Sequence, residues 1–303
     1  MFAVAFDHFG GPEVLALTER PEPHAADGRL RIRVLASGVA PVDLGLRSGG
    51  TPMSKTLALP HIPGVDAAGI VDEIGAGASG AAIGDEVFGT VDIRTLGGAN
   101  AEFAVLANWA VRPSAFPWEQ AGAAGSSVET ATRVLDLLDL RAGMTLLIDG
   151  AAGGVGSVAV QLAVARGVRV IGTASAVNHE FLASLGAEPT TYGPGLASRV
   201  GHVDRALHVS GAGSLPQLVD LTGSADTVVT IADYTAAGLG VRMSGGELAG
   251  QPSGWHGLAA AADLAAAGRF RVPVQAVFPF SRASEAHTLA SSGPRQGKIA
   301  LLP

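Results

Sequence analysis

The thirty residues Leu146–Ser175, LLIDGAAGGVGSVAVQLAVARGVRVIGTAS, constrain the fold more than any other segment. The short apolar run Leu146–Ile148 is typical of a parallel strand that is buried on both faces. A glycine-rich turn follows it. We expect a helix over residues 157–166 and a second strand at Val168–Ile171. The segment therefore predicts a strand, a tight turn, a helix and a second strand, in that order.

The turn in this segment predicts a binding site for a dinucleotide. Its pattern is Ala-x-Gly-x-x-Gly, with alanine where the usual fingerprint has its first glycine. Small residues let the backbone approach a pyrophosphate, and the N–H groups at the start of the helix face its negative charge. The residues expected to contact the coenzyme here are Gly150, Ala151, Gly153, Gly154, Val155 and Gly156.

Residues 1–116 are expected to form a β-rich domain, because short apolar runs alternate with Gly/Pro turns. Leu30, Ile32 and Val34 alternate with polar residues and would share one strand face. The strands expected in this domain are Ala3–Phe6, Leu30–Ser37, Ala67–Ile74, Glu86–Thr90 and Ala101–Leu106.

Residues 117–256 are expected to form a doubly wound α/β domain, because strands and helices alternate after a helical pattern over Trp118–Leu138. Residues 257–303 would return to the first domain. The later elements expected are strands near Glu188–Thr191, Arg205–Val209, Ala225–Ile231, Gln275–Phe280 and Ile299–Leu302, and helices near His179–Ser184, Ser214–Leu221, Leu258–Ala267 and Ser281–Ala290.

Composition excludes several classes of function. The net charge of −7 without a basic cluster argues against a nucleic-acid partner. No apolar run reaches about 18 residues and the N-terminus has no basic region, so we expect no membrane span and a cytoplasmic location. The chain has no cysteine, and its eight histidines are scattered, so no metal site is expected.

Four blocks and the C-terminal strand resemble one enzyme family across essentially the whole chain. The blocks are SGVAPVD at 37–43, IPGVDAAG at 62–69, GDEVFG at 84–89 and the turn at 150–156, with GKIAL at 297–301. They resemble the zinc-free branch of the medium-chain dehydrogenase/reductase superfamily, the quinone oxidoreductase-like enzymes. Zinc alcohol dehydrogenases have Gly-His-Glu where this chain has Gly64-Val65-Asp66, and a cysteine after the first Ser-Gly-Val.

The resemblance implies a GroES-like catalytic domain, a Rossmann domain, an active site between them and a homodimer. It implies hydride transfer from NADPH to a quinone, an enone or an enoyl thioester. The residues that it places near the nicotinamide are Val42, Asp43, Thr130, Ser210, Ile231 and Ala232. The last three also follow expected strands, where ligands bind in open α/β sheets.

We expect NADPH rather than NADH because Gly172–Ser175 contains no carboxylate for a ribose 2′-hydroxyl. Ser175 is expected either to cap a helix or to donate to a 2′-phosphate. By likeness to the family, His179 and Tyr192 would approach the same group. Relatives that bind NADPH usually have a lysine or arginine just after this serine, and this chain has Asn178-His179.

Asp43 and Thr130 are the catalytic candidates, each with a packing or capping role as the alternative. Related enzymes have asparagine where this chain has Ala40, and many have a tyrosine within the stretch 48–51, so the product's proton is expected from water. His61 could line the cleft, although a structural role is favoured. Glu129 would face either the substrate or solvent.

The leading hypothesis is an NADPH-dependent reductase of quinones or enones. One alternative is an enoyl-thioester reductase, which needs a basic patch, and another is an NADP(H)-binding protein without turnover. The arginines available for such a patch do not cluster in the sequence; they are Arg94, Arg242, Arg269 and Arg271.

Overall fold

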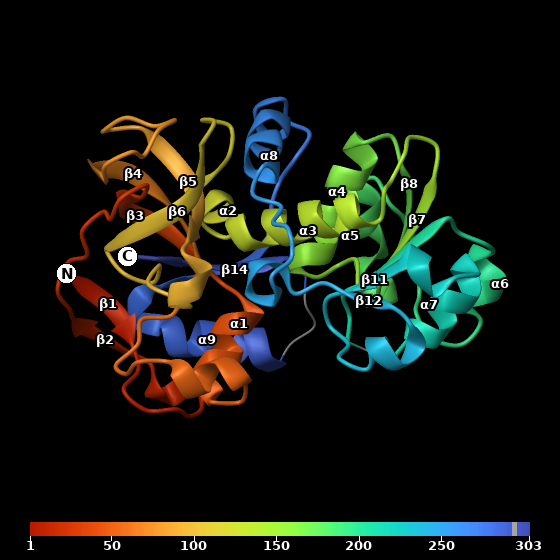
Figure 1. Ribbon diagram of the computed structural model, residues 1–303, viewed down its shortest axis with the longest axis horizontal. Helices are drawn as coiled ribbons and strands as arrows, with labels where there is room; N and C mark the ends of the chain where they lie inside the picture. Colours follow the sequence, from red (N-terminus) through yellow and green to blue (C-terminus); the bar gives the residue numbers. More distant parts are fainter. Residues whose placement is uncertain (212, 293–295) are drawn as a thin grey trace. The chain divides into compact units, whose positions relative to one another are not determined.

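The computed structural model describes residues 1–211, 213–292 and 296–303, which form two compact units. The first unit contains Met1–Ser126 and Leu258–Pro303, and the second contains Ser127–Gly257. Helix α3 (Gly125–Leu137) carries the chain out of the first unit, and α8 (Gly257–Ala266) returns it. Both chain termini therefore belong to the first unit (Figure 1).

The first unit is built on a mainly antiparallel six-stranded sheet. Strand β3 pairs with β4, β6 and β14, so the run β3–β6 closes on itself, and only β13 and β14 pair in parallel. A separate hairpin joins β1 (Phe2–Ala5) to β2 (Ala16–Glu19). In sheet order the six strands are β13 (Val274–Pro279), β14 (Lys298–Leu302), β3 (Leu30–Val39), β4 (Asp66–Ile74), β5 (Glu86–Val91) and β6 (Phe103–Val111).

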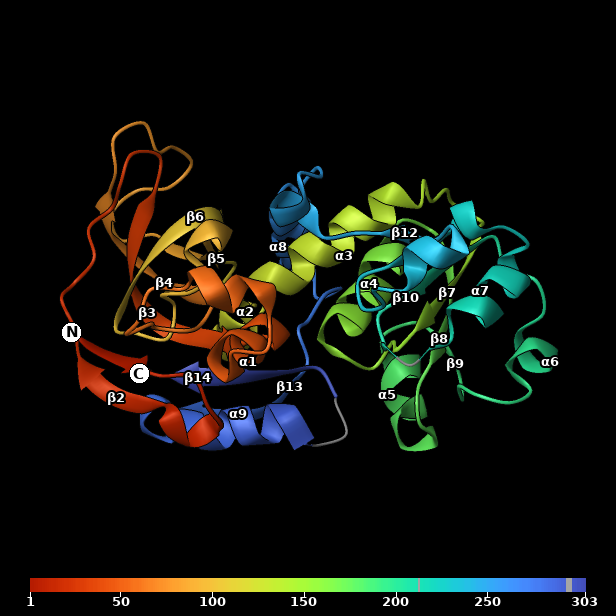
Figure 2. The same cartoon turned by 60° about the horizontal axis from the view of Figure 1, so that its bottom comes forward.

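The core of this unit follows the alternation in β3. Leu30, Ile32 and Val34, which were predicted to share one strand face, are all buried and belong to one hydrophobic cluster. Besides α8 and the start of α3, the described part of the unit has three α-helices, and Figure 2 shows α1 and α9 beside the sheet. They are α1 (Pro41–Ser48), α2 (Trp118–Gly122) and α9 (Ala283–Ser292).

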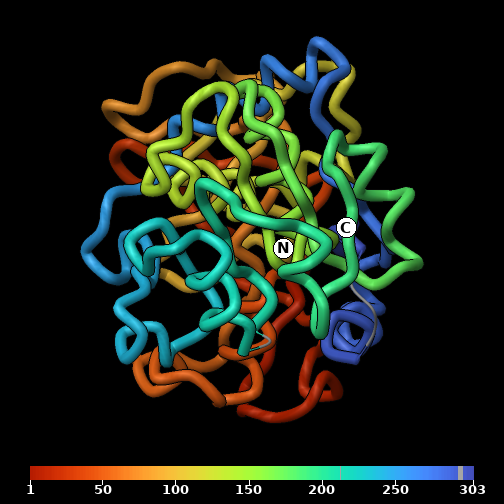
Figure 3. Tube along the Cα trace, turned by 90° about the vertical axis from the view of Figure 1, so that its right-hand side faces the viewer, coloured from red at the N-terminus to blue at the C-terminus, as the bar shows by residue number. Residues whose placement is uncertain are grey.

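The second unit is a parallel six-stranded sheet of the doubly wound type. The strand order is β12-β11-β10-β7-β8-β9, so the direction of winding reverses between β7 and β10. Right-handed crossovers then place α4 and α5 on one face and α7 on the other, as Figures 1 and 3 show. The strands are β7 (Thr145–Asp149), β8 (Arg169–Thr173), β9 (Glu188–Thr190), β10 (Arg205–His208), β11 (Val228–Thr230) and β12 (Arg242–Met243); the helices are α4 (Gly154–Ala165), α5 (His179–Ser184), α6 (Leu196–Val200) and α7 (Leu215–Thr222).

Several boundaries differ from those expected from sequence. The helical pattern over residues 118–138 is divided between α2 and α3 at Ala123 and Ala124, whose small side chains give no periodic signal. Helix α4 begins at Gly154, three residues before the expected start, for the same reason. The strand expected near Ala225–Ile231 is shorter, because Ala225–Thr227 forms a 3₁₀ turn. The other 3₁₀ turns span Pro12–Val14, Pro52–Thr56, Ile93–Thr95, Ala176–Asn178, Ala236–Leu239, Gly246–Ala249 and Phe280–Arg282.

Candidate functional site

In the turn between β7 and α4, neighbouring backbone atoms lie too close to two glycines to admit a side chain. Gly150 has φ +92°, and a Cβ there would lie 3.0 Å from the backbone N of Ser210. A Cβ on Gly156 would lie 2.4 Å from the Gly150 carbonyl oxygen and 2.8 Å from Cα of Ala151. The protein's internal packing therefore requires a very small residue at both positions.

Gly153 differs from these two glycines. It precedes α4 as the N-cap residue with φ −74°, which other residues adopt readily. A Cβ there would meet nothing closer than the Gly150 carbonyl oxygen, at 3.6 Å. The chain's own packing does not demand glycine at this position. The first-turn N–H groups of α4, including those of Gly154 and Val155, lack intrahelical acceptors, so this surface can hold an anion.

Asp149, the last residue of β7, joins the ends of three strands. Its buried carboxylate accepts hydrogen bonds from the hydroxyls of Ser210 (2.7 Å), Ser214 (2.6 Å) and Thr173. The Thr173 hydroxyl oxygen also accepts from the Gly150 N–H at 3.1 Å. This carboxylate positions the glycine turn relative to the ends of β8 and β10. The sequence reasoning missed Asp149, although it directly follows the predicted strand.

His208 connects the hydrogen-bonded side chains around Asp149 to the end of β11. It is fully buried; Nδ1 lies 2.8 Å from the Thr230 hydroxyl and Nε2 lies 3.8 Å from an Asp149 oxygen. Burial lowers the pKa of His208, and the negative charges of Asp149 and Asp233 oppose that shift only partly. The Thr230 hydroxyl also accepts from the Ala232 N–H at 3.1 Å. The turn that contains Ile231 and Ala232 is therefore held by Thr230, which contacts His208.

The carboxyl ends of β8 and β9 carry three of the residues expected at the coenzyme. Ser175 follows β8, makes no capping hydrogen bond with its side chain and accepts one from Asn178 Nδ2 at 3.3 Å. Nε2 of His179 is buried and has no hydrogen-bond partner among the described residues. Tyr192 lies in the loop after β9 with 60% of its surface exposed. The first acidic residue after β8 is the exposed Glu180.

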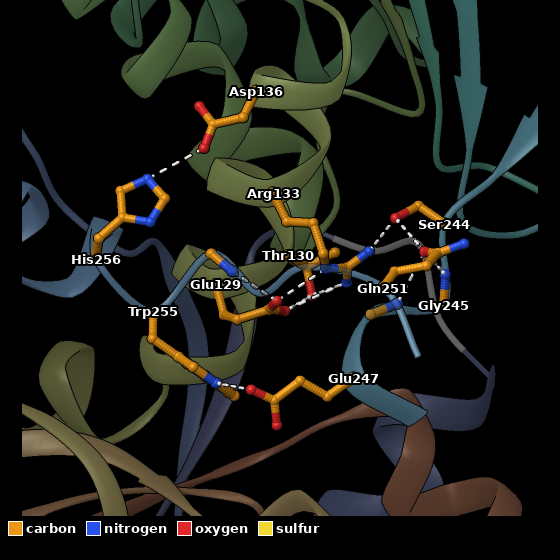
Figure 4. A network of polar contacts seen from close by, with 12 residues as sticks. Glu129, Thr130, Arg133, Asp136, Ser244, Gly245, Glu247, Gln251, Trp255 and His256 are labelled. Atoms are coloured by element: carbon orange, nitrogen blue, oxygen red, sulfur yellow. Dashed lines mark hydrogen bonds and ion pairs between the residues drawn. The ribbon is translucent and has the colours of Figure 1, made fainter. Parts of the chain in front are cut away.

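Thr130 lies on α3 within a network of buried charge (Figure 4). The Glu129 carboxylate accepts from Arg133 Nε at 2.8 Å, the Gly254 N–H at 3.1 Å and the Thr130 hydroxyl at 3.1 Å. Arg133 also donates to Ser244. The placement of Glu129 in solvent is wrong, because it is only 7% exposed and forms an internal ion pair with Arg133.

Asp43 is fully buried near the start of α1 in the first unit. Its carboxylate accepts from the N–H groups of Ala40 (2.8 Å) and Gly64 (2.9 Å). Burial raises the pKa of Asp43 to about 6, although these two hydrogen bonds favour the charged form. The carboxylate therefore ties the block at residues 37–43 to the block at residues 62–69. Val42 is half-buried on the same helix.

His61 has a structural role in the first unit. Its Nε2 lies 3.1 Å from the Leu96 carbonyl oxygen, and its ring packs edge-on against Phe6 with centroids 5.5 Å apart. Burial lowers the pKa of His61. These contacts agree with the structural role that the sequence analysis favoured for His61.

The structure brings most of the expected coenzyme residues to one edge of the parallel sheet. The glycine turn, Ser210, Ile231 and Ala232 follow β7, β10 and β11, and Ser175 and Tyr192 follow β8 and β9. This is the edge at which doubly wound sheets bind ligands, and β7 and β10 flank the switch point. Val42 and Asp43 belong to the other unit, and Thr130 belongs to α3.

Comparison with known proteins identifies the family. Residues 26–115 match the model described as alcohol dehydrogenase GroES-like domain, and residues 188–301 match the model described as zinc-binding dehydrogenase. The quinone oxidoreductase from Coxiella burnetii has a similar structure, with a TM-score of 0.88 and 28% identity over 100% of this chain and 99% of that one. The chain belongs to the quinone oxidoreductase-like medium-chain dehydrogenases/reductases.

Two curated relatives support the same assignment. A quinone oxidoreductase from Pongo abelii is 40% identical over 178 residues, which is 57% of this chain and 53% of the relative. An NADPH-dependent alkenal/one oxidoreductase from Arabidopsis thaliana is 33% identical over 199 residues, which is 62% of this chain and 51% of the relative. The chain thus spans about half the length of the curated relatives that it matches.

Two further findings concern this dehydrogenase/reductase fold. The described residues contain no group of three or more His, Asp or Glu side chains placed to hold a metal ion. Within the described ranges, no helix has both the length and the apolar character needed to cross a bilayer.

Proposed function

We propose that the protein is an NADPH-dependent reductase that transfers hydride to a quinone or an α,β-unsaturated carbonyl compound without a metal. Gly153 is the observation that carries this proposal. Its neighbours Gly150 and Gly156 are explained by internal packing, whereas the surface over Gly153 is open. Close approach of a ligand to the backbone accounts for the missing side chain. Glycine before a helix in a doubly wound sheet is typical of a pyrophosphate site.

The named activities of the relatives support the reaction class. They include quinone oxidoreductases, a 2-methylene-furan-3-one reductase from Solanum lycopersicum and the alkenal/one oxidoreductase. Quinones and conjugated carbonyl compounds both accept a hydride at an electron-poor carbon. Such acceptors need little acid–base help, so positioning can supply most of the rate enhancement.

NADPH is favoured over NADH by the end of β8. No carboxylate follows this strand to bind a ribose 2′-hydroxyl or to repel a 2′-phosphate. Ser175 can donate its hydroxyl proton, because its oxygen already accepts from Asn178. The alkenal/one oxidoreductase among the relatives is named as NADPH-dependent, which agrees with this choice.

The reduced nicotinamide would supply the hydride, and the protein would bind and orient it. The turn at 150–156 would bind the pyrophosphate, and Ser210, Ile231 and Ala232 would contact the nicotinamide half. Thr130 would accept hydrogen bonds, because its hydroxyl proton is already directed to Glu129. Asp43 would act as a positioning residue, because both of its oxygens accept backbone N–H groups and it is fully buried. The product's proton would come from water.

The proposal is tested by following NADPH oxidation with a naphthoquinone, a simple enone and crotonyl-CoA as separate acceptors. Turnover of the quinone or the enone supports the proposal, and turnover of the thioester alone would support an enoyl-thioester reductase instead. NADPH binding without oxidation by any acceptor would leave a binding protein. We also expect a cytoplasmic homodimer, which cell fractionation and light scattering would check.

A further inference from the structure

The loop between β9 and α6 is held by a single arginine. Arg199 Nε donates to the Thr190 hydroxyl at 3.1 Å, Nη1 donates to the Pro194 carbonyl at 3.0 Å and Nη2 donates to the Thr191 carbonyl at 2.7 Å. Gly195 allows this arrangement, since a Cβ there would lie 2.9 Å from Nη1. The guanidinium is therefore fixed in place although the residue is exposed.

The position of this guanidinium is set by the parallel sheet. Thr190 ends β9 and pairs with Thr173, which ends β8. The Ala174 N–H donates to the Thr190 carbonyl at 3.0 Å, and Ser175 is the next residue. Ser175 and Arg199 are therefore connected through Ala174 and Thr190 at the carboxyl edge of the sheet. Figure 2 shows β8, β9 and α6 together in this part of the unit.

The charge of Arg199 is not neutralised inside the protein. All three of its acceptors are uncharged oxygens, and among the described residues no carboxylate lies within ion-pair distance of it. The nearest strand carboxylate along the chain, Glu188, lies at the opposite end of β9 and pairs with Arg169. Three donated hydrogen bonds leave two guanidinium N–H groups for a ligand. A fixed, uncompensated cation at this edge is suited to binding an anion.

We propose that Arg199 is the specificity-determining residue that selects NADPH, by binding the ribose 2′-phosphate together with Ser175. The inference rests on the coenzyme site of the proposed function. The second strand of a doubly wound sheet ends beside the adenosine ribose, and an arginine nearby accommodates a 2′-phosphate. Here the cation comes from α6 rather than from the residues that directly follow Ser175. His179, whose buried Nε2 has no hydrogen-bond partner among the described residues, follows Ser175 by four positions.

The test measures coenzyme affinity rather than turnover. Dissociation constants for NADPH and NADH would be measured by fluorescence titration of wild-type protein, Arg199→Gln and Arg199→Lys, with Arg242→Gln as the control. Arg242 is an exposed arginine of the same unit that donates to one carbonyl. Loss of a charge-assisted contact should weaken NADPH binding by about 10- to 100-fold in Arg199→Gln and leave NADH binding nearly unchanged. Arg199→Lys should retain part of the preference, and Arg242→Gln all of it.

The outcomes separate this inference from the proposed function. Equal weakening of NADPH and NADH would show that Arg199 only supports the loop and would overturn the inference, as would unchanged NADPH binding. If wild-type protein bound neither dinucleotide, the proposed function would fall and the inference with it. The same titrations with 2′,5′-ADP and 5′-AMP isolate the phosphate. Added salt should weaken 2′,5′-ADP binding more in wild-type protein than in Arg199→Gln.

Discussion

Gly153 and Gly156 should respond to substitution in opposite ways, although they belong to one motif. At Gly153 a side chain would point into open space, with its first atom 3.6 Å from the nearest protein atom outside its chain neighbours. At Gly156 the first atom would overlap the Gly150 carbonyl oxygen at 2.4 Å. We therefore expect Gly153→Val to impair ligand binding and Gly156→Ala to impair folding.

The magnitudes follow from the contacts involved. Valine at position 153 would block at least one charge-assisted N–H contact to the pyrophosphate, worth about 1.5–3 kcal/mol, or roughly 10- to 150-fold in affinity. Its cost to stability should stay below about 1 kcal/mol, because the position is an N-cap with ordinary backbone angles. Alanine at position 156 should destabilise the protein by about 1–3 kcal/mol through overpacking.

Urea unfolding and NADPH titration of both variants would measure these effects. Wild-type NADPH affinity in Gly153→Val would refute the reasoning, because the space over this residue would then not hold the coenzyme. Gly156→Ala provides the matched control: it is the smaller change of the two, yet it should cause the larger loss of stability. Equal stability of the two variants would show that the packing distances do not govern the motif.

Three further predictions concern buried charge. His287 is fully buried, and burial lowers its pKa from 6.5 to about 4. The unfolded chain therefore takes up the proton first, and about 3 kcal/mol of stability should be lost as pH falls through that interval. His287→Leu should flatten this part of a plot of urea midpoint against pH, and an unchanged slope would exclude this histidine as the cause. Asp43 acts in the opposite direction: because its pKa is raised from 3.8 to about 6, the folded state loses stability as pH rises through that interval. Asp43→Asn should therefore steepen the loss of stability in acid. It should also cost about 1–3 kcal/mol, since the two N–H groups bond separate carboxylate oxygens and the amide NH2 would replace one of these acceptors. Glu129→Leu should lower the free energy of unfolding by about 3–5 kcal/mol, because it leaves the Arg133 charge unpaired in the interior. The double variant with Arg133→Leu should recover much of that stability. Additive losses of stability in a double-mutant cycle would contradict the coupling between Glu129 and Arg133.

The sequence predicted the doubly wound sheet and its glycine turn because both have local signals. Apolar runs mark β7 and β8, and the spacing of small residues marks the turn. Helix boundaries were less accurate where residues are small: Gly154–Gly156 form the first turn of α4 without any apolar periodicity. Ala123 and Ala124 hide the division between α2 and α3 in the same way.

The polar connections at the site could not be predicted from sequence, because they join residues far apart in the chain. Asp149 and Ser210 are 61 residues apart, and Glu129 and Gly254 are 125 apart. No local pattern shows that Asp149 would collect hydroxyls from two other segments at the sheet edge. Arg199 was overlooked for a similar reason, since only the pairing of β8 with β9 brings its helix toward Ser175.

The contact between Glu129 and Gly254 has a consequence for how the protein can be taken apart. Helix α3 enters the second unit close to Glu129, and the chain leaves that unit just after Gly254. A Cβ on Gly254 would lie 2.2 Å from the Glu129 carbonyl oxygen, and one on Gly257 would lie 2.0 Å from the Thr132 hydroxyl. Residues 127–257 thus form a cassette whose entrance and exit are fastened to each other. We therefore expect residues 127–257 to be exchangeable between related enzymes by cutting the chain at two neighbouring points.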